Sequence, residues 1–334
     1  MSEPSTASKL PDETLAFFAD LHPPKSDFRE DVLSGLAALP KTIPPKYFYD
    51  AIGSALFDDI TQTPEYYVTR TELALLDDIS DEIADRAGKG AVVIEPGSGS
   101  SVKIDKLLGA LDEPAAYIGL DISKSHLLAA CRDLSSRWSG LKVGAVCADF
   151  TRHVDLHDMA IPDGRRLVFF PGSTIGNFEP DAARELLNGI RDWLRPGDGF
   201  LVGADRVKTR DTLRAAYDDA DGVTARFNLN LLTRINRELN GDIDIGAFRH
   251  SAIWNEHMSR IEMHLIAQCD MKFSVDGHDF SMTKGETIHT ENSHKFTVAS
   301  FQDLARSAGL EPVAHWSDAD GYFTLHWLEY RDIT

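Results

Sequence analysis

The chain contains few cysteines, no long apolar run and too few basic residues to balance its acids. Its three cysteines, Cys131, Cys147 and Cys269, lie far apart and form no CxxC pair, which argues against a disulfide framework and a zinc site. No stretch approaches the roughly 20 apolar residues of a membrane span. The amino-terminal residues also lack the basic region and apolar core of a secretion signal. We therefore expect a cytoplasmic protein without a membrane segment.

Acidic residues outnumber basic residues by 53 to 34, which gives a formal net charge of −19. Such a charge repels phosphate backbones, and the sequence shows no basic patch of the kind that nucleic-acid-binding proteins display. We therefore expect a small-molecule substrate, rather than a nucleic acid or a membrane, as the binding partner. We also expect a monomer.

Short apolar runs rich in β-forming residues alternate with helical patterns through the middle of the chain. The pattern covers AVVIEPGSGS, KIDKLLGAL, AAYIGLDIS, SHLLAACRDLSSRW, LKVGAVCADF, RLVFFPGS, DAARELLNGIRDWL and GFLVGADR. Strands separated by helices of this length predict a doubly wound α/β core with a parallel, Rossmann-like sheet. The chain ends with two strand patterns, EPVAHWSD and YFTLHWLEYR, whose connection predicts an antiparallel hairpin.

The pattern changes after Lys208, where a long helical stretch, LRAAYDDADGVTARFNLNLLTRINREL, precedes several strand patterns. A chain of 334 residues also exceeds the usual size of a single core, which favours two domains. We assign residues 70–207 and 296–334 to the α/β core and residues 14–69 and 208–295 to a second, α+β substrate-binding domain. Residues 1–13 are predicted to form a flexible N-terminus, within a loose segment that reaches about Lys25.

Two glycines, Gly97 and Gly99, stand at a predicted strand-to-helix turn on either side of Ser98. The missing Cβ atoms permit tight dihedral angles and a close approach of a ligand to the backbone. The third glycine of the dinucleotide-binding fingerprint is absent, because Val102 stands in its place. The turn alone is weak evidence, but it disfavours a pyrophosphate-containing ligand.

The next two predicted strands also end in polar residues. Asp121 follows Gly97 at the spacing at which a carboxylate reaches the ribose hydroxyls of a bound nucleoside. Asp149 could accept from an adenine amino group, and the ring of Phe150 could lie against the adenine face. Ligands in such sheets bind beyond the carboxyl ends of the strands. The three strand ends together favour an adenosine cofactor without pyrophosphate.

Aromatic residues are concentrated before the core, in residues 43–57 and 63–72, where a core or interface role is also open. These two segments resemble the start of the histidine-specific methyltransferases of ergothioneine biosynthesis, the EgtD family. The likeness runs from about Pro40 onward and includes four further motifs, in the right order, at residues 172–177, 215–219, 261–263 and 290–293. The resemblance implies a class I S-adenosylmethionine-dependent methyltransferase fold and three methylations of the L-histidine α-amino group, giving hercynine.

The resemblance also implies roles for individual residues. Tyr66 would be the catalytic residue beside the amino nitrogen, and Glu291 and Ser293 would bind the imidazole. The full predicted substrate-binding set is Tyr49, Phe57, Tyr66, Gly172, Asn177, Tyr217, Met263, Glu291 and Ser293, in which Asn177 and Tyr217 would bind the carboxylate. The predicted cofactor-binding set is Tyr49, Gly97, Ser98, Lys103, Asp121, Asp149 and Phe150, with S-adenosylmethionine as the cofactor.

Strand periodicity agrees with the imidazole assignment, because residues two apart in a strand share a face. Glu291 and Ser293 would then point the same way and Asn292 the opposite way. A metal site at His289, Glu291 and His294 is disfavoured by the irregular spacing, so we expect no metal. Three alternatives stay open: a related methyltransferase acting on tryptophan or a prenylated tryptophan, a nicotinamide-dependent oxidoreductase, and a non-catalytic adenosine-binding protein.

Overall fold

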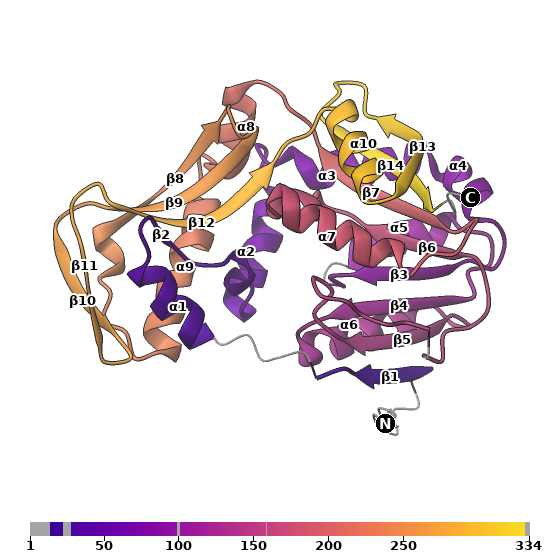
Figure 1. Cartoon of the computed structure of the whole chain (residues 1–334), viewed down its shortest axis with the longest axis horizontal. Helices are drawn as coiled ribbons and strands as arrows, with labels where there is room; N and C mark the ends of the chain where they lie inside the picture. The colour runs from indigo at the N-terminus through magenta and orange to yellow at the C-terminus, as the bar shows by residue number, and fades with distance from the viewer. Residues whose placement is uncertain (1–13, 23–27, 99–100, 158, 331–334) are drawn as a thin grey trace. The chain divides into compact units, whose positions relative to one another are not determined.

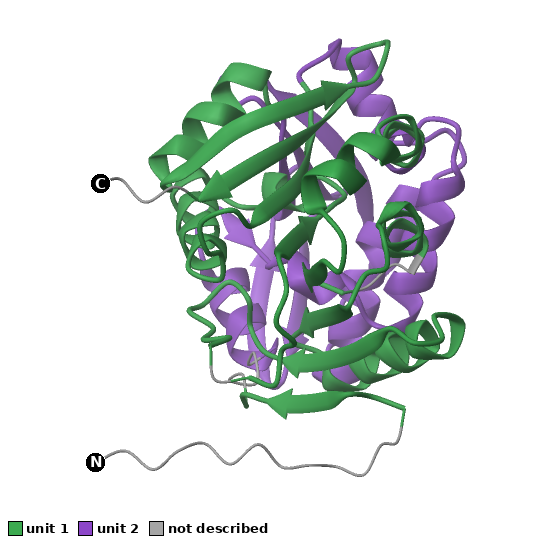
Figure 2. Ribbon diagram, turned by 90° about the vertical axis from the view of Figure 1, so that its right-hand side faces the viewer, with its two compact units in different colours: residues 1–25, 71–206, 296–334 green, residues 26–70, 207–295 purple. Residues whose placement is uncertain are grey.

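The computed structural model describes residues 14–22, 28–98, 101–157 and 159–330. The chain divides into two compact units, which Figure 2 colours separately. Unit 1 comprises residues 1–25, 71–206 and 296–334, and unit 2 comprises residues 26–70 and 207–295. The boundary between residues 70 and 71 falls inside helix α3 (Tyr67–Asp78). No helix among the described residues is long and apolar enough to cross a membrane.

Unit 1 is built on an eight-stranded sheet in the order β1-β5-β4-β3-β6-β7-β14-β13 (Figure 1). The parallel strands are β1 (Phe17–Asp20), β3 (Val92–Pro96), β4 (Ala116–Asp121), β5 (Lys142–Cys147), β6 (Arg166–Phe170) and β7 (Gly199–Asp205). Strands β13 (Leu310–Ser317) and β14 (Phe323–Tyr330) form the predicted antiparallel hairpin, and β14 pairs antiparallel with β7. This arrangement confirms the predicted fold class, a Rossmann-like sheet that ends in an antiparallel hairpin.

The helices of unit 1 flank this sheet (Figure 1). They are α4 (Ser80–Ala87), α5 (Ser101–Ala110), α6 (Lys124–Arg137), the 3-10 helix η2 (Thr174–Asn177), α7 (Pro180–Arg191) and α10 (Val298–Ser307). The central strands β3, β6 and β7 are buried along their whole length, so they are mainly apolar and show no alternation. Capping also defines the helix starts: α10 begins with a capping box between Thr297 and Ser300.

One domain prediction is wrong at the N-terminal end, where residues 14–25 were assigned to the substrate-binding domain. Strand β1 lies in that segment and pairs in parallel with β5 of unit 1. The ring of Phe17 covers Gly144 so closely that a Cβ atom at position 144 would lie 2.3 Å from it. Sheet pairing and this contact therefore place β1 with the α/β core. The predicted flexible N-terminus, residues 1–13, lies outside the described residues.

Unit 2 contains a four-stranded sheet in the order β2-β12-β9-β8 and a two-stranded sheet of β10 and β11. The strands are β2 (Lys41–Thr42), β8 (Phe248–Asn255), β9 (Arg260–Ala267), β10 (Met271–Val275), β11 (His278–Met282) and β12 (Thr287–His294). The helices are α1 (Phe28–Ala37), η1 (Pro45–Phe48), α2 (Ala51–Gln62), α8 (Arg210–Tyr217), α9 (Val223–Glu238) and η3 (Ile245–Ala247). Both α8 and α9 pack against β8 and β9, and α2 packs against α9.

The long helical stretch after Lys208 forms two helices instead of one. Helix α8 ends at Tyr217, and Gly222 has a φ angle of 67°, a left-handed conformation that glycine adopts without a Cβ penalty. The Asp219 carboxylate then accepts from the N–H groups of Val223 and Thr224 at 2.8 and 2.7 Å, and these are two of the orphan donors at the start of α9. The break therefore comes from local turn and capping chemistry within an otherwise helical pattern.

We expect Gly199→Ala to destabilise unit 1. The new Cβ atom would lie 2.2 Å from the buried indole of Trp327, and overpacking of this kind costs about 1–3 kcal/mol. Gly189→Ala is the matched control, because nothing lies within 4 Å of its new Cβ atom in α7 and alanine favours a helix over glycine by about 1 kcal/mol. Urea unfolding should show a loss for the first variant and a gain for the second. Equal stability of both variants would contradict the packing.

Candidate active site

The glycine turn of unit 1 begins where β3 ends. Gly97 has a φ angle of 74°, and its N–H and that of Ser98 both donate to the Leu120 carbonyl, at 2.8 and 3.1 Å. A Cβ atom on Gly97 would lie 3.5 Å from the Phe150 ring. The turn thus brings three predicted cofactor-binding residues together, Gly97, Ser98 and Phe150. Gly99 lies outside the described residues.

The two predicted acids lie at the neighbouring strand ends. Asp121 is the last residue of β4, and Asp149 follows β5 by two residues. Because β5, β4 and β3 are adjacent and parallel, their carboxyl ends meet at one edge of the sheet. Burial raises the pKa of Asp121, although the Ser123 N–H donates to its carboxylate at 2.7 Å. Thr151 donates to one oxygen of Asp149 through its N–H and its hydroxyl.

Lys103 lies in α5, and its ammonium forms an ion pair with the Glu72 carboxylate at 2.7 Å. The Glu72 side chain is fully buried. The Gly172 N–H also donates to both Glu72 oxygens, at 3.0 and 2.9 Å. A Cβ atom on Gly203 would lie 2.3 Å from the same carboxylate. Glu72 therefore ties a predicted cofactor residue to the loop after β6, in a space that only glycine at position 203 leaves open.

A second buried carboxyl lies under the glycine turn. The Tyr117 hydroxyl donates to Glu95 at 2.5 Å and lies 2.8 Å from the Ser98 hydroxyl. Burial raises the pKa of Glu95 to about 8. Sequence reasoning assigned no role to Glu95, Tyr117 or Glu72. Glu72 and Glu95 each lie in a segment that the sequence analysis singles out. Their hydrogen-bond and ion-pair partners are distant in the sequence, so no local pattern indicates the contacts.

The remaining predicted residues of unit 1 lie in the loop after β6. Gly172 follows the strand by two residues, and Asn177 is the last residue of η2. The Ser173 hydroxyl, between them, accepts from the Asp205 N–H at 2.9 Å and so fixes the loop to the end of β7. Asn177 is partly buried. The assignment of Gly172 and Asn177 to the substrate stays a prediction.

Unit 2 holds the predicted aromatic residues in one cluster. The ring centroids of Tyr49 and Phe57 are 5.7 Å apart, those of Phe57 and Tyr66 are 6.2 Å apart, and those of Tyr66 and Tyr217 are 6.2 Å apart. Phe227 of α9, which sequence reasoning missed, contacts Tyr49 at 5.8 Å. Tyr49 is positioned by its neighbour Asp50, whose carboxylate caps α2. We call these five rings the aromatic cluster.

Strand β12 carries the two predicted imidazole ligands. Glu291 lies opposite Met263 of β9, and Ser293 lies opposite Ile261. A register shift between His289 and Glu291 interrupts the pairing before this point. The Ser293 hydroxyl lies 2.8 Å from the Tyr217 hydroxyl, which connects β12 to the aromatic cluster. The structure therefore brings Met263, Glu291, Ser293 and Tyr217 together within unit 2.

Two ionisable side chains, Glu291 and Lys295, lie in this part of unit 2. Burial raises the pKa of Glu291 to about 7, and Lys295 opposes this shift. The Lys295 ammonium, 2.8 Å from the Ser293 hydroxyl and 2.9 Å from the Tyr217 hydroxyl, is itself buried. Sequence reasoning missed Lys295, although it follows Ser293 at the spacing of a shared strand face.

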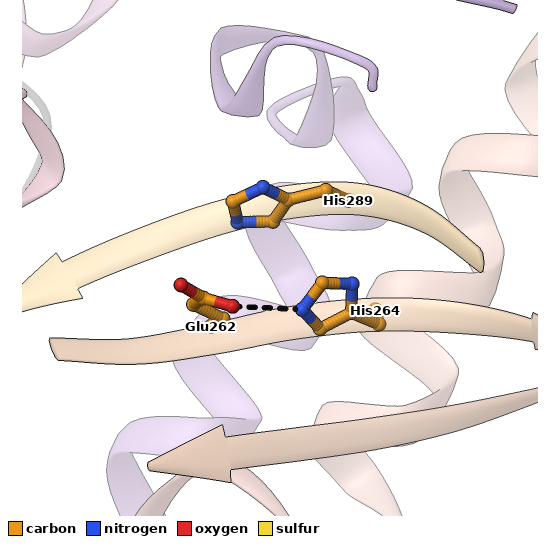
Figure 3. A group of neighbouring side chains, drawn as sticks. All are labelled: Glu262, His264 and His289. Atoms are coloured by element: carbon orange, nitrogen blue, oxygen red, sulfur yellow. Dashed lines mark hydrogen bonds and ion pairs between the residues drawn. The ribbon is translucent and has the colours of Figure 1, made fainter. Parts of the chain in front are cut away.

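Glu262, His264 and His289 form a separate group that could hold a metal ion. Figure 3 shows Glu262 and His264 side by side on β9, with the His289 ring next to them from β12. His289 Nε2 lies 3.0 Å from the Glu291 carbonyl, which only accepts, so this nitrogen is a donor. His264 Nε2 lies 3.2 Å from the Glu262 carboxylate. Hydrogen bonds thus account for this arrangement, and the expectation of no metal stays a prediction.

The described geometry agrees with a family profile that covers most of the chain. The profile described as "Histidine-specific methyltransferase, SAM-dependent" matches residues 28–330. The chain belongs to the histidine-specific methyltransferase family. This methyltransferase is 44% identical over 303 residues to histidine N-alpha-methyltransferase of Mycolicibacterium smegmatis, covering 89% of this chain and 93% of that protein.

A second relative of this methyltransferase is histidine N-alpha-methyltransferase of Mycobacterium tuberculosis, at 42% identity over 303 residues, with the same shares of both chains. Among solved structures, an S-adenosylmethionine-dependent methyltransferase from Clostridium acetobutylicum matches with a TM-score of 0.47 and 10% identity, covering 82% of this chain and 97% of that chain. Family membership confirms the predicted enzyme class, cofactor and type of substrate, a small molecule.

We expect Glu72→Gln to destabilise this methyltransferase, because it leaves the buried Lys103 ammonium without its carboxylate. Breaking a buried ion pair costs about 3–5 kcal/mol. Glu113→Gln is the matched control, since Glu113 pairs with Lys89 at 3.0 Å on the exposed surface, where such pairs contribute little. Urea unfolding measures both variants. A Glu72 variant as stable as the Glu113 variant would contradict the role of the buried pair.

We expect Glu291→Gln to stabilise the methyltransferase at alkaline pH. The folded-state pKa of about 7 exceeds the ordinary value of 4.5, so the wild type loses stability as the pH rises from 4.5 through 7. The variant cannot ionise there, and its melting temperature should exceed that of the wild type at pH 8 and match it at pH 4. Glu256→Gln, at an exposed position of unit 2, is the control. A difference that does not widen with pH contradicts the burial of Glu291.

Proposed function

We propose that this methyltransferase transfers three methyl groups from S-adenosylmethionine to the α-amino nitrogen of L-histidine and releases hercynine, the first step of ergothioneine biosynthesis. The observation that carries the proposal is the placement of Glu291 and Ser293 on β12, with Met263 opposite and Tyr217 alongside. The names of the two relatives, histidine N-alpha-methyltransferase, support the same substrate.

Recognition of the imidazole ring rests on its two nitrogens. The Glu291 carboxylate accepts from a ring N–H, and the Ser293 hydroxyl meets the other nitrogen. An unpaired buried polar group costs about 1–3 kcal/mol, so a ring without both nitrogens binds less tightly. Indole has a single N–H and no second nitrogen, and so satisfies only one of the two protein groups. This difference favours histidine over tryptophan.

The described residues of unit 1 fit S-adenosylmethionine, because Gly97 leaves space beside the Phe150 ring and two carboxylates follow the adjacent strands. When bound, the cofactor supplies a methyl group on a sulfonium sulfur. We assign Asp121 to the ribose hydroxyls, Asp149 to the adenine amino group and Phe150 to the adenine face. Ser98, Lys103 and Tyr49 stay predicted cofactor contacts.

The substrate amine must be neutral when it attacks the methyl group. We assign Tyr66 to orient this amine, while its proton leaves through water, and we invoke no strong general base. Each transfer to the neutral amine gives an ammonium with one positive charge, and the first two products must lose a proton before the next transfer. Only the third product, which is quaternary, keeps its positive charge permanently. Aromatic rings attract such a cation through their π faces, and we assign this role to Tyr49, Phe57 and Tyr66, whose rings are neighbours in the aromatic cluster. Successive methylations then need no change of site.

Several finer points stay predictions. They are the binding of the substrate carboxylate by Asn177 and Tyr217, the cytoplasmic location, the monomeric state and the absence of a nucleic-acid or membrane partner. The division of labour between the units, with substrate residues mainly in unit 2, is also a proposal.

The proposal is tested with purified protein, S-adenosylmethionine and either histidine or tryptophan. We expect one hercynine and three equivalents of S-adenosylhomocysteine per histidine consumed, measured by mass spectrometry. Accumulation of monomethylhistidine as the end product would refute trimethylation. Preferential methylation of tryptophan would keep the chemistry but overturn the assignment of the ring.

Glu291→Ala tests ring recognition within the same assay. It should lower turnover of histidine on the order of tenfold or more, because the ring N–H loses a charged acceptor, while binding of S-adenosylhomocysteine is unchanged. Wild-type turnover of histidine by this variant would remove Glu291 from the proposed site.

A further inference from the structure

Three buried polar side chains of unit 2, His250, Asn228 and Thr290, form a continuous series of hydrogen bonds that we call the His250 network. His250 lies on β8, and its Nε2 atom is 2.7 Å from the carbonyl of Tyr217, the last residue of α8. Its Nδ1 atom is 2.9 Å from the amide nitrogen of Asn228 on α9. The Asn228 oxygen accepts from the hydroxyl of Thr290 on β12 at 2.9 Å. The network thus connects two helices with two strands.

The partners of His250 determine where its proton lies. A carbonyl only accepts, so Nε2 donates to Tyr217, and an amide nitrogen only donates, so Nδ1 accepts from Asn228. His250 is therefore neutral, with its proton on Nε2. Burial lowers the pKa of His250, although the Tyr217 carbonyl and the carboxylates of Asp218 and Asp219 oppose this shift. The neutral ring thus satisfies both neighbours at once.

The two ends of the His250 network lie at residues that the proposed function assigns to opposite ends of the substrate. Tyr217, whose carbonyl accepts from His250, would bind the carboxylate. Thr290 directly precedes Glu291, which would bind the imidazole ring. The Thr290 hydroxyl also lies 3.0 Å from the carbonyl of Met263, the residue opposite Glu291 in the sheet. The network therefore links the carboxylate side of the proposed site to its ring side.

The bond from His250 matters most for the end of α8. The Tyr217 carbonyl lies in the last turn of this helix, where backbone carbonyls lack the N–H groups of a following turn. His250 supplies the missing donor from a strand, so the end of the helix is held at a fixed place relative to the sheet. The position of the Tyr217 side chain then follows from a bond to its own backbone.

We propose that the His250 network sets the spacing between Tyr217 and Glu291, which makes His250 a positioning residue that selects amino acids by their length. This inference rests on the proposed function, from which it takes the carboxylate and ring contacts. A histidine bound at both ends fits one spacing only. An analogue with one more methylene group loses one of the two contacts, and one methylene changes discrimination by about 10- to 200-fold.

The first experiment compares L-histidine with L-homohistidine, which has one more methylene group between the α-carbon and the ring. Calorimetry on the wild-type protein with S-adenosylhomocysteine measures the affinity for each ligand. We expect a preference of about tenfold or more for histidine. Equal affinities would overturn the inference, because the site would then not select by length. This comparison needs no variant.

A variant series tests whether the His250 network causes the preference. His250→Leu removes the donor to the Tyr217 carbonyl, and Thr290→Val removes the bond to Asn228 while keeping the shape of the side chain. Each variant should weaken histidine binding by about tenfold and leave homohistidine binding unchanged, since homohistidine already lacks one of the two contacts. A purely structural role would weaken both ligands by the same factor. That result, or an unchanged preference, would overturn the inference.

Two control variants accompany the series. Thr290→Ser keeps the hydroxyl group and should retain the wild-type preference for histidine. His326→Leu removes a different buried histidine, which stacks on Phe301 in unit 1 with ring centroids 4.3 Å apart, and should change neither affinity. Loss of the preference in either control would contradict a specific role of the His250 network.

The outcomes separate the inference from the proposed function. Selection by length that depends on the network, without any methyl transfer to histidine, refutes the function and supports the role of His250. Trimethylation of histidine by a wild type that binds homohistidine equally well refutes the role of His250 and supports the function. Failure of the wild type to bind histidine overturns both.

Discussion

Parallel pairing of β3, β4 and β5 is the constraint on which the proposed cofactor site depends. Because the three strands run the same way and lie next to one another, their carboxyl ends open onto one edge of the sheet. Gly97, Asp121 and Asp149 come from three separate stretches of sequence, and the strand pairing brings all three to the same edge of the sheet. The apolar strands supply the stability, and the residues just beyond them are free to carry chemistry.

The proposed substrate site depends on the alternation of side chains along a strand. In unit 2 the alternation of β12 sends Glu291 and Ser293 to one face, and the register with β9 adds Met263 to them. The register shift after His289 decides which residues share that face. Helix α8 then places Tyr217 against Ser293. Both units use common residue types. The proposed chemistry depends on how the fold brings these residues together.

Much of the fold could be predicted from the sequence because its signals are local. Alternating strands and helices predicted the parallel sheet, and the turn at 318–321 predicted the C-terminal hairpin. Strand β1 was missed because it has four residues and is held by pairing with a strand more than a hundred positions away. The division of α8 from α9 was missed because the capping by Asp219 interrupts a continuous helical pattern.

The residues of the candidate site also differ in whether a local sequence signal predicts them. Strand ends predicted Asp121 and Asp149, and the resemblance predicted most of the other site residues, with strand alternation agreeing for Glu291 and Ser293. Glu72 could not be found, because its partners Lys103 and Gly172 come from other parts of the chain and only folding makes them neighbours. Lys295 could have been noticed from its spacing to Ser293, but a lysine at that spacing reads as a solvent-facing charge. Hydrophobic patterns do not predict which charged residues are buried.

Strand β1 also covers one edge of the sheet of unit 1. The Ala16 N–H and the Leu21 N–H donate to carbonyls of β5 residues Val143 and Cys147, so β1 covers a flank of β5 that would otherwise present open backbone groups. A shortened chain that begins at residue 28 would turn β5 into a bare edge, a template on which other chains can add strands. We therefore expect a chain trimmed past β1 to associate through the exposed edge of β5 more readily than the full chain does.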